Sequence, residues 1–227
     1  MRANQPDAII DLPATLRASL IRGSEVELRD LQAKQFLQRQ RALIVFVIDA
    51  SESMGQGSLE RMKAAKGAIL GLLTAAYQNR DQVALVSFGG ERAQVLLRPT
   101  SSVLLAQQQL RKLPLGGATP FADGLWQGWQ LIRTQRQKQP SLQPLLVIVS
   151  DGEANLPLSP GGNVYDELFG LALQVARDQI QSVVIDSRGG VGNEKLQQLA
   201  RRLGGRYTQI RDLHAGRLIE AVQTLER

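Results

Sequence analysis

Three short stretches of this chain carry oxygen-bearing side chains at positions that a parallel sheet would bring together. Asp49, Ser51 and Ser53 occupy alternate positions directly after an apolar run. Thr119 precedes a proline that can open a helix, and Asp151 ends another apolar run. Carboxylate and hydroxyl oxygens suit a hard cation such as Mg²⁺, Mn²⁺ or Ca²⁺ better than zinc or copper. The five side chains therefore predict a divalent-cation site with a coordination position left open for water or a ligand.

Each of these residues also fits a common structural role. Asp or Ser after a strand often caps the next helix or forms a turn. Thr119 followed by Pro120 suits an N-cap with proline at the first helical position. The metal site is favoured because all five oxygens arise at the ends of the elements that should converge.

The elements that must position these residues alternate along the chain. Apolar runs without alternation predict strands that are buried on both faces of a parallel sheet. The expected strands are 43–49, 82–88, 145–151, 182–186 and 205–210, with a short returning edge strand at 93–98. The expected helices are 58–78, 102–113, 121–136, 165–179, 195–203 and 214–225. This order predicts an α/β fold with a doubly wound, mostly parallel sheet, one short antiparallel edge strand and helices on both faces.

The chain is expected to comprise one main domain and a preceding segment. Residues 41–227 account for the whole doubly wound unit, and no internal repeat follows Arg41. Residues 1–40 form a segment packed on or flanking that domain, containing one edge strand or one short helix. The alternating run EVEL at Glu25 is the candidate for the strand.

Composition excludes several kinds of site. The 227 residues include no cysteine, so a disulfide framework, a thiolate metal site and a cysteine nucleophile are excluded. No apolar run is long enough to span a membrane, and the first residues lack the features of a secretory signal. A cytoplasmic location is therefore expected. The formal charge of +6 admits nucleic acid as a partner, but the basic residues are spread over helices with few aromatics, so this partner is not expected.

Other chemistries find little support. The one histidine, His214, is far along the chain from Ser51 and Ser53, which argues against a Ser-His-Asp triad. Trp126 and Trp129 stand three apart on an expected helix and predict core packing with one ring at the surface. No catalytic residue is assigned.

The oxygen-bearing residues resemble a known family. Asp49, Ser51, Ser53, Thr119 and Asp151 match, residue by residue, the metal-ion-dependent adhesion site of von Willebrand factor A (integrin I-like) domains. In that family the serines and the threonine ligate Mg²⁺ or Mn²⁺, and the carboxylates act directly or through water. The resemblance implies that an Asp or Glu of a partner completes the metal shell.

A narrower resemblance covers most of the chain. The segments that carry it include DLPATLRASL at Asp11, AAYQNRDQVALVSF at Ala75, LPLGGATPFADGL at Leu113, VSDGEANLPL at Val149 and LARRLGGRY at Leu199. They are similar to the carboxyl-terminal part of the D-type component of magnesium chelatase, whose family inserts Mg²⁺ into protoporphyrin IX in an ATP-driven, three-component complex. The resemblance implies two partners, an AAA+ chelatase ATPase subunit and, through it, a large porphyrin-binding subunit.

This chain departs from that family at several points. It has no GxxxxGK[ST] phosphate loop, so ATP hydrolysis by that mechanism is not expected. Glu52, Gly89 and Glu153 replace a glycine and two arginines that are usual near the metal loops. If these side chains face the site, they disfavour an acidic partner.

The predicted function is that of a metal-dependent docking domain, a non-ATPase D-type component of a magnesium or related metal chelatase. The alternative is a stand-alone adhesion or scaffold module that grips an unrelated acidic ligand through the same cation. A third possibility, favoured only by the basic charge, is that the chain binds nucleic acid. In that case its affinity for nucleic acid would fall steeply as the salt concentration rises.

Overall fold

The computed structural model describes residues 9–23, 25–33, 42–51, 67, 69–71, 73–74, 76, 78, 81–113, 116–188 and 191–210. The chain divides into two compact units, Met1–Arg39 and Gln40–Arg227. The oxygen-bearing residues all belong to the second unit.

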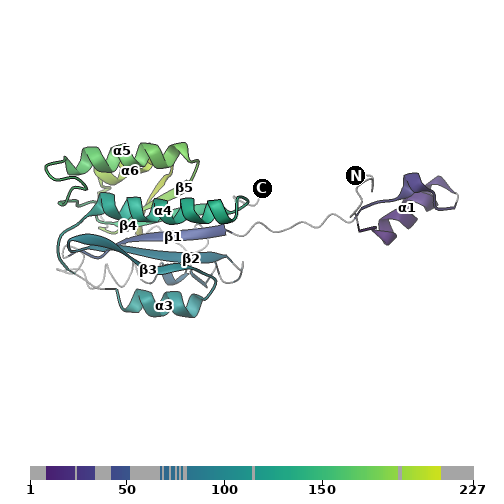
Figure 1. Ribbon diagram of the computed structural model, residues 1–227, viewed down its shortest axis with the longest axis horizontal. Helices are drawn as coiled ribbons and strands as arrows, with labels where there is room; N and C mark the ends of the chain where they lie inside the picture. The colour runs from purple at the N-terminus through teal and green to yellow at the C-terminus, as the bar shows by residue number, and fades with distance from the viewer. Residues whose placement is uncertain are drawn as a thin grey trace. The chain divides into compact units, whose positions relative to one another are not determined.

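The second unit is built around a six-stranded sheet with the order β3-β2-β1-β4-β5-β6. The strands are β1 (Ala42–Asp49), β2 (Gln82–Gly89), β3 (Arg92–Thr100), β4 (Gln143–Ser150), β5 (Gln181–Asp186) and β6 (Arg206–Gln209). Every neighbouring pair is parallel except β2 and β3, which are antiparallel. The predicted mostly parallel sheet with one antiparallel edge strand is thus confirmed (Figure 1).

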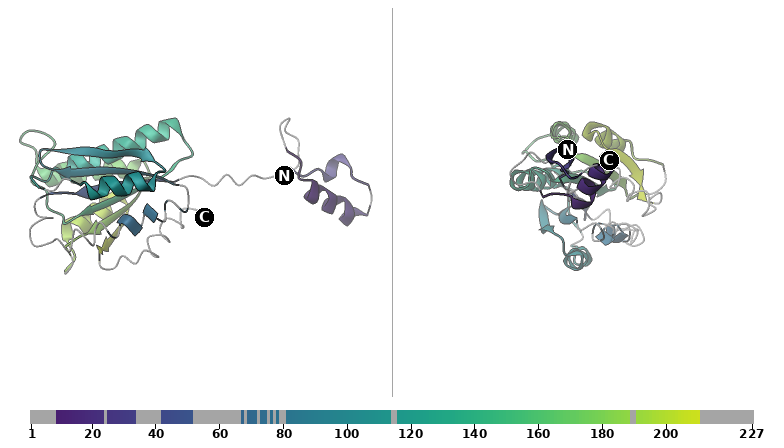
Figure 2. Two further views of the ribbon diagram at one scale, coloured as in Figure 1. Left: turned by 90° about the horizontal axis from the view of Figure 1, so that it is seen from below. Right: turned by 90° about the vertical axis from the view of Figure 1, so that its right-hand side faces the viewer.

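Helices cover both faces of this sheet (Figures 1 and 2). The labelled helices are α3 (Val103–Arg111), α4 (Phe121–Lys138), α5 (Val164–Arg177) and α6 (Glu194–Leu203). One buried cluster joins the sheet to α4, α5 and α6, and a second joins its other face to α3 and to helical positions between residues 67 and 78. The rest of the helix expected at 58–78, and the helix expected at 214–225, lie outside the described residues.

The order in which strands are added to the sheet reverses between β1 and β4. From β1 the sheet continues to β2 and β3 on one side, and to β4, β5 and β6 on the other. Ligands of open α/β sheets bind outside the carboxyl ends of strands at such a switch point. Every residue of β1 is buried because helices cover both faces, so a polar side chain at its end is buried too. This end carries Asp49.

The first unit contains a helix, α1 (Leu12–Arg22), and a single 3-10 turn, η1 (Leu28–Asp30). Asp11 caps α1 by accepting the Ala14 N–H at 3.1 Å, and Gly23 ends it with a φ of 74°. The run that begins at Glu25 forms no strand; its last residue opens η1 instead.

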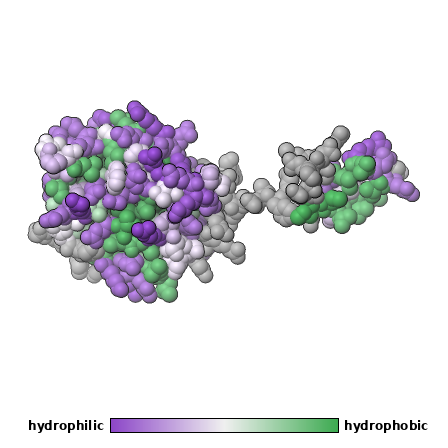
Figure 3. All heavy atoms as spheres, in the orientation of Figure 1, coloured by the Kyte–Doolittle hydropathy of each residue, from purple (hydrophilic) through white to green (hydrophobic). Residues whose placement is uncertain are grey.

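Three leucines of α1 one turn apart expose apolar surface within this unit. Leu12, Leu16 and Leu20 are 66%, 50% and 77% exposed, and they form an apolar stripe (Figure 3). Among the described helices of the chain, none is both long and apolar enough to cross a bilayer.

Candidate metal site

Asp49 is the centre of the candidate site. It ends β1, is 0% exposed, and both of its oxygens accept hydrogen bonds. Oδ1 accepts the Ser51 N–H at 3.0 Å and the Ser51 hydroxyl at 2.6 Å, and Oδ2 accepts the Ser150 hydroxyl at 2.7 Å. Asp49 therefore fixes the position of the Ser51 hydroxyl at this edge of the sheet.

The carboxylate of Asp49 has no positive counterpart among the described residues. Burial raises its pKa to about 6, the negative charge of Asp151 adds to this effect, and the hydroxyl bonds from Ser51 and Ser150 oppose it. None of the described lysines and arginines forms an ion pair with it. A divalent ion would supply the missing positive charge.

Asp151 lies one residue beyond β4 and is 2% exposed. Its Oδ1 accepts the Glu153 N–H at 3.0 Å, and its backbone carbonyl accepts a hydrogen bond from Asn193 Nδ2 at 2.9 Å. Within the described part of the chain, Oδ2 of Asp151 has no hydrogen-bond partner. One oxygen of this carboxyl group is thus held by the loop, and the other is available to a ligand.

Thr119 is brought to the same edge by backbone contacts of the loop before α4. The Gly116 N–H donates to the Ala50 carbonyl at 2.8 Å, and the Gly90 N–H donates to the Ala118 carbonyl at 2.9 Å. These bonds tie the loop to the end of β1 and to the β2–β3 turn. Gly117 permits this approach because its φ is +82° and a Cβ there would lie 2.6 Å from the Gly90 Cα.

The Thr119 hydroxyl is not used as a helix cap. The N-cap of α4 is Pro120, and no side chain caps this helix. The Thr119 N–H donates to Asn155 Oδ1 at 2.6 Å, whereas its hydroxyl has no hydrogen-bond partner in the part of the chain that the structure describes. The capping alternative for this residue is therefore wrong, and the hydroxyl is free to ligate a cation.

Four of the five predicted residues thus gather at one edge of the sheet. Asp49, Ser51, Thr119 and Asp151 are all at most 2% exposed there, and Ser53 lies outside the described residues. Sequence reasoning missed the residues that hold the loops together, namely Ser150, Asn155 and Asn193. Their only signal was polarity close to a strand end, which many surface residues share.

The donor set fits a hard divalent cation. The described residues contain no group of three or more His, Cys, Asp or Glu side chains that could hold a metal. An ion at this edge would therefore depend on two carboxylates together with hydroxyls and water. Mg²⁺ favours such a shell, since it keeps several waters and takes one or two carboxylates.

We expect the affinity for Mg²⁺ to fall as pH drops below about 6. The cation needs Asp49 deprotonated, and the pKa of that carboxyl is raised to about 6 in the metal-free domain. Below that pH each unit should weaken binding about tenfold, because one proton competes with the ion. Calorimetric titration of Mg²⁺ at pH 5, 6 and 7.5 measures this dependence. An unchanged affinity over this range would show that Asp49 does not ligate.

Two of the three departures near the site are described by the structure. Glu153 forms an ion pair with Arg188 from the loop after β5, so the positive charge of Arg188 offsets its negative charge near the site. Gly89 leaves no room for a side chain in this backbone, because a Cβ there would lie 2.9 Å from the carbonyl carbon of Ala50. Glu52 and the histidine His214 lie outside the described residues.

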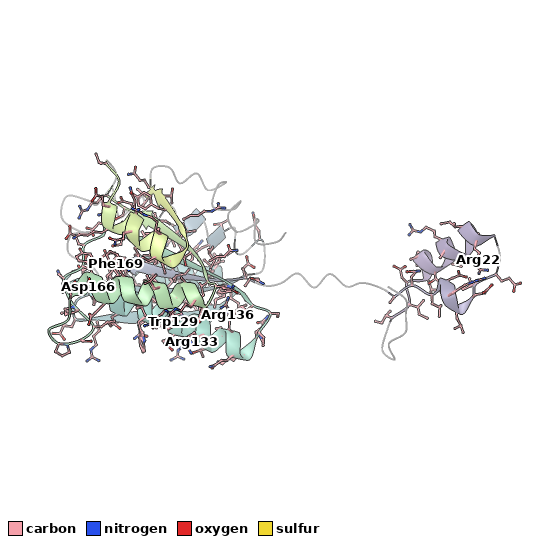
Figure 4. The ribbon with its side chains drawn as sticks, turned by 90° about the horizontal axis from the view of Figure 1, so that it is seen from above. Arg22, Trp129, Arg133, Arg136, Asp166 and Phe169 are labelled. Carbon is pink, nitrogen blue, oxygen red and sulfur yellow. The ribbon has the colours of Figure 1, made fainter. Side chains whose placement is uncertain are left out.

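The two tryptophans of α4 have different surroundings. Trp129 is 9% exposed, and its Nε1–H donates to Asp178 Oδ2 at 2.6 Å. Arg133 lies over the Trp129 ring, and Arg136 donates to the Asp178 carbonyl at 2.5 Å (Figure 4). The two bonds to Asp178 hold α4 against the end of α5, and the loop of Thr119 leads into α4. Trp126 is 40% exposed.

Comparisons with known sequences identify relatives of this chain. The model of the von Willebrand factor type A domain matches residues 44–153. The magnesium-chelatase 67 kDa subunit of Chlorobaculum tepidum is 38% identical over 218 residues, which are 90% of this chain and 33% of that protein. The chain therefore spans about a third of that relative's length. An uncharacterized protein of Methanocaldococcus jannaschii, MJ0910, is 31% identical over 75% of this chain and 98% of its own length.

Solved structures share the fold at low sequence identity. The manganese-loaded TRAP protein of Plasmodium vivax superposes with a TM-score of 0.59 at 16% identity, covering 77% of this chain and 70% of that one. At this identity the likeness supports the fold alone.

Proposed function

Because this chain belongs to the von Willebrand factor type A domain family and is related to magnesium-chelatase subunits, we propose that it is a metal-dependent protein-docking domain. We assign it as a non-ATPase, D-type component of a magnesium or related metal chelatase complex. Its ion is Mg²⁺ or Mn²⁺. Its partners are the AAA+ chelatase ATPase subunit and, through it, the large porphyrin-binding subunit. The location that goes with this function is the cytoplasm.

The observation that carries the proposal is that four oxygen-bearing side chains gather around Asp49, a buried carboxylate with no ion-pair partner among the described residues. Ser51 and Thr119 would ligate through their hydroxyls, and Asp49 and Asp151 directly or through water, with Ser53 as the fifth predicted ligand. When bound, the cation supplies a positive charge at an exposed coordination position. The carboxylate of a partner Asp or Glu fits this position, since it is a hard oxygen donor of opposite charge.

The side chains of this domain do the remaining work. Asp49 fixes the Ser51 hydroxyl, and Asn155 fixes the backbone of Thr119, so both donors are positioned before a partner arrives. A partner carboxylate would then favour one arrangement of these loops. Such a bias can couple docking to the nucleotide state of the ATPase.

Calorimetric titration of the AAA+ subunit into this domain tests the proposal. We expect binding with Mg²⁺ and none with chelator, because the partner carboxylate needs the ion. Ser51→Ala should weaken binding by tenfold or more, since it removes one ligand and its hydrogen bond to Asp49. Ser182→Ala is the matched control: this serine is 4% exposed near the opposite end of β5, and its loss should leave binding unchanged. Equal wild-type binding with Mg²⁺ and with chelator would overturn the proposal.

A stand-alone docking module remains the second candidate. It is favoured by the relative from Methanocaldococcus jannaschii, which this chain matches over 98% of its length. In this case the same ion would bind an acidic ligand that is unrelated to a chelatase. This candidate would be supported if the AAA+ subunit fails to bind and a different acidic protein is captured instead. That capture should depend on Mg²⁺ and be lost in Ser51→Ala.

A further inference from the structure

A groove of about 580 Å³ lies beside the candidate metal site. It runs between the first turns of α4, the β2–β3 turn and the loop that follows Asn155. Its apolar lining includes Ala93, Pro120, Trp126, Leu156, Pro157 and Leu158. Its other lining residues are polar or charged, namely Glu91, Arg92, Asp123, Gln127 and Ser159, so that the groove offers both apolar and polar contacts to a bound segment.

The walls of the groove are held in place by carboxylates. Asp123, on the first turn of α4, accepts the Ala93 N–H at 2.7 Å and fixes the β2–β3 turn. Glu167, near the start of α5, accepts the Leu158 N–H at 2.6 Å and the Ser159 N–H at 3.1 Å. The turn and the loop are thus preformed, so that little ordering is needed when a segment binds.

Two lining residues of the groove follow residues of the metal-site loops directly in the chain. Pro120 follows Thr119 directly, and Leu156 follows Asn155, whose side chain accepts the Thr119 N–H at 2.6 Å. A segment that places a carboxylate at the ion beside Thr119 therefore reaches the groove within a few residues. Because the groove adjoins the metal-site loops, we infer that it binds the same segment of the partner that supplies the metal-ligating carboxylate.

An exposed aromatic ring lies in the groove. Trp126 is 40% exposed, and Leu158, in the loop wall, is 43% exposed. Indole faces pack favourably against proline and aromatic rings. Tryptophan is also enriched among the residues that carry most of the binding energy at interfaces.

We propose that this groove receives the residues next to the partner's metal-ligating Asp or Glu, and that a proline or aromatic side chain of this segment packs on Trp126. The inference rests on the proposed function and adds partner selectivity to it. The ion would bind any accessible carboxylate, whereas the groove selects the sequence around that carboxylate.

Trp126→Ala tests the groove separately from the ion. In titrations with the AAA+ subunit and Mg²⁺ we expect affinity to fall roughly 10- to 30-fold, as for an aromatic residue central to an interface. Stabilisation of the domain by Mg²⁺ alone should be retained, which also shows that the variant is folded. Leu173→Ala is the control, because Leu173 is 45% exposed on α5, is not among the residues lining the groove, and should not matter. Leu158→Ser, on the loop wall, should weaken binding in the same direction.

Comparison with Ser51→Ala separates the two ideas. Loss of binding in Ser51→Ala together with weakening in Trp126→Ala supports both. A second outcome is that Ser51→Ala loses binding, while Trp126→Ala and Leu158→Ser bind as tightly as the control Leu173→Ala. This result overturns the role of the groove and leaves the metal-dependent docking intact. No effect of Ser51→Ala overturns both, because the segment would then not be anchored at the ion. A dimer of this domain that is lost in Trp126→Ala would also overturn the inference, since a second copy would occupy the groove.

Discussion

Asp49→Asn is expected to abolish the stabilisation of the domain by Mg²⁺ and to make the metal-free domain more stable at pH 7. The first effect follows from loss of the charge that attracts the ion. The second follows from burial, which raises the pKa of Asp49 from 3.8 to about 6. A pKa raised in the folded state adds stability at low pH, and this stability is lost as pH rises through about 4 to 6.

The size of the second effect follows from the same shift. One pKa unit corresponds to about 1.4 kcal/mol, so ionising Asp49 at pH 7 costs the metal-free fold up to about 3 kcal/mol. Asparagine does not ionise, and its Oδ1 can still accept the two bonds from Ser51, whereas its Nδ2 cannot accept the Ser150 hydroxyl, which reduces the gain. We therefore expect a gain of about 1–3 kcal/mol in the free energy of unfolding at pH 7, and a smaller gain at pH 5.

Urea unfolding with chelator at pH 5 and pH 7, repeated with Mg²⁺, measures both effects. Asp166→Asn serves as the control, because Asp166 is an exposed aspartate on the first turn of α5 (Figure 4). Its replacement should leave the response to Mg²⁺ unchanged. If Asp49→Asn still gained stability from Mg²⁺, Asp49 would not be part of a cation site.

Gly117→Ala is expected to destabilise the domain by about 3 kcal/mol and to weaken Mg²⁺ binding. A positive φ costs a residue with a side chain of order 1–3 kcal/mol, and Gly117 has a φ of +82°. Its new Cβ would also lie 2.6 Å from the Gly90 Cα, so the loop that carries Thr119 would have to move.

Gly161→Ala isolates the contribution of the positive φ, so that its difference from Gly117→Ala gives the contribution of the contact with Gly90. Gly161 has a similar φ of +78° but nothing within 4 Å of an added Cβ, so this variant reports the backbone effect alone. Urea unfolding and Mg²⁺ titration of both variants give the comparison. Equal losses of stability, with Mg²⁺ affinity unchanged in each, would show that the contact between Gly117 and Gly90 does not position Thr119.

Much of the fold was predictable because the signal is local. Apolar runs such as the one ending in Asp49 indicate strands covered on both faces, and the returning run after Gly90 indicates the antiparallel edge. The carboxyl ends of these strands then place Asp49 and Asp151 at one edge. The predicted strand at 145–151 ends one residue earlier in the structure, at Ser150, which leaves Asp151 in the loop.

The remaining features depend on contacts between distant residues. Nothing local indicates that Gly117 packs on Gly90, that Asn155 accepts the Thr119 N–H, or that Glu153 pairs with Arg188. In the first unit the apolar spacing from Leu12 and the cap at Asp11 could have indicated the helix. The alternating run at Glu25 gave equal weight to a strand, because four residues are too few to separate the two periods.

The most direct test is a crystal structure of the domain grown with Mn²⁺, with anomalous scattering used to locate the ion. We predict one peak at the edge of the sheet between β1 and β4, within direct ligation distance of the hydroxyl oxygens of Ser51 and Thr119 and near Asp49 and Asp151. Saturating Mn²⁺ with no peak at this edge, or with peaks only elsewhere, would contradict the account, and the buried oxygens would then be structural.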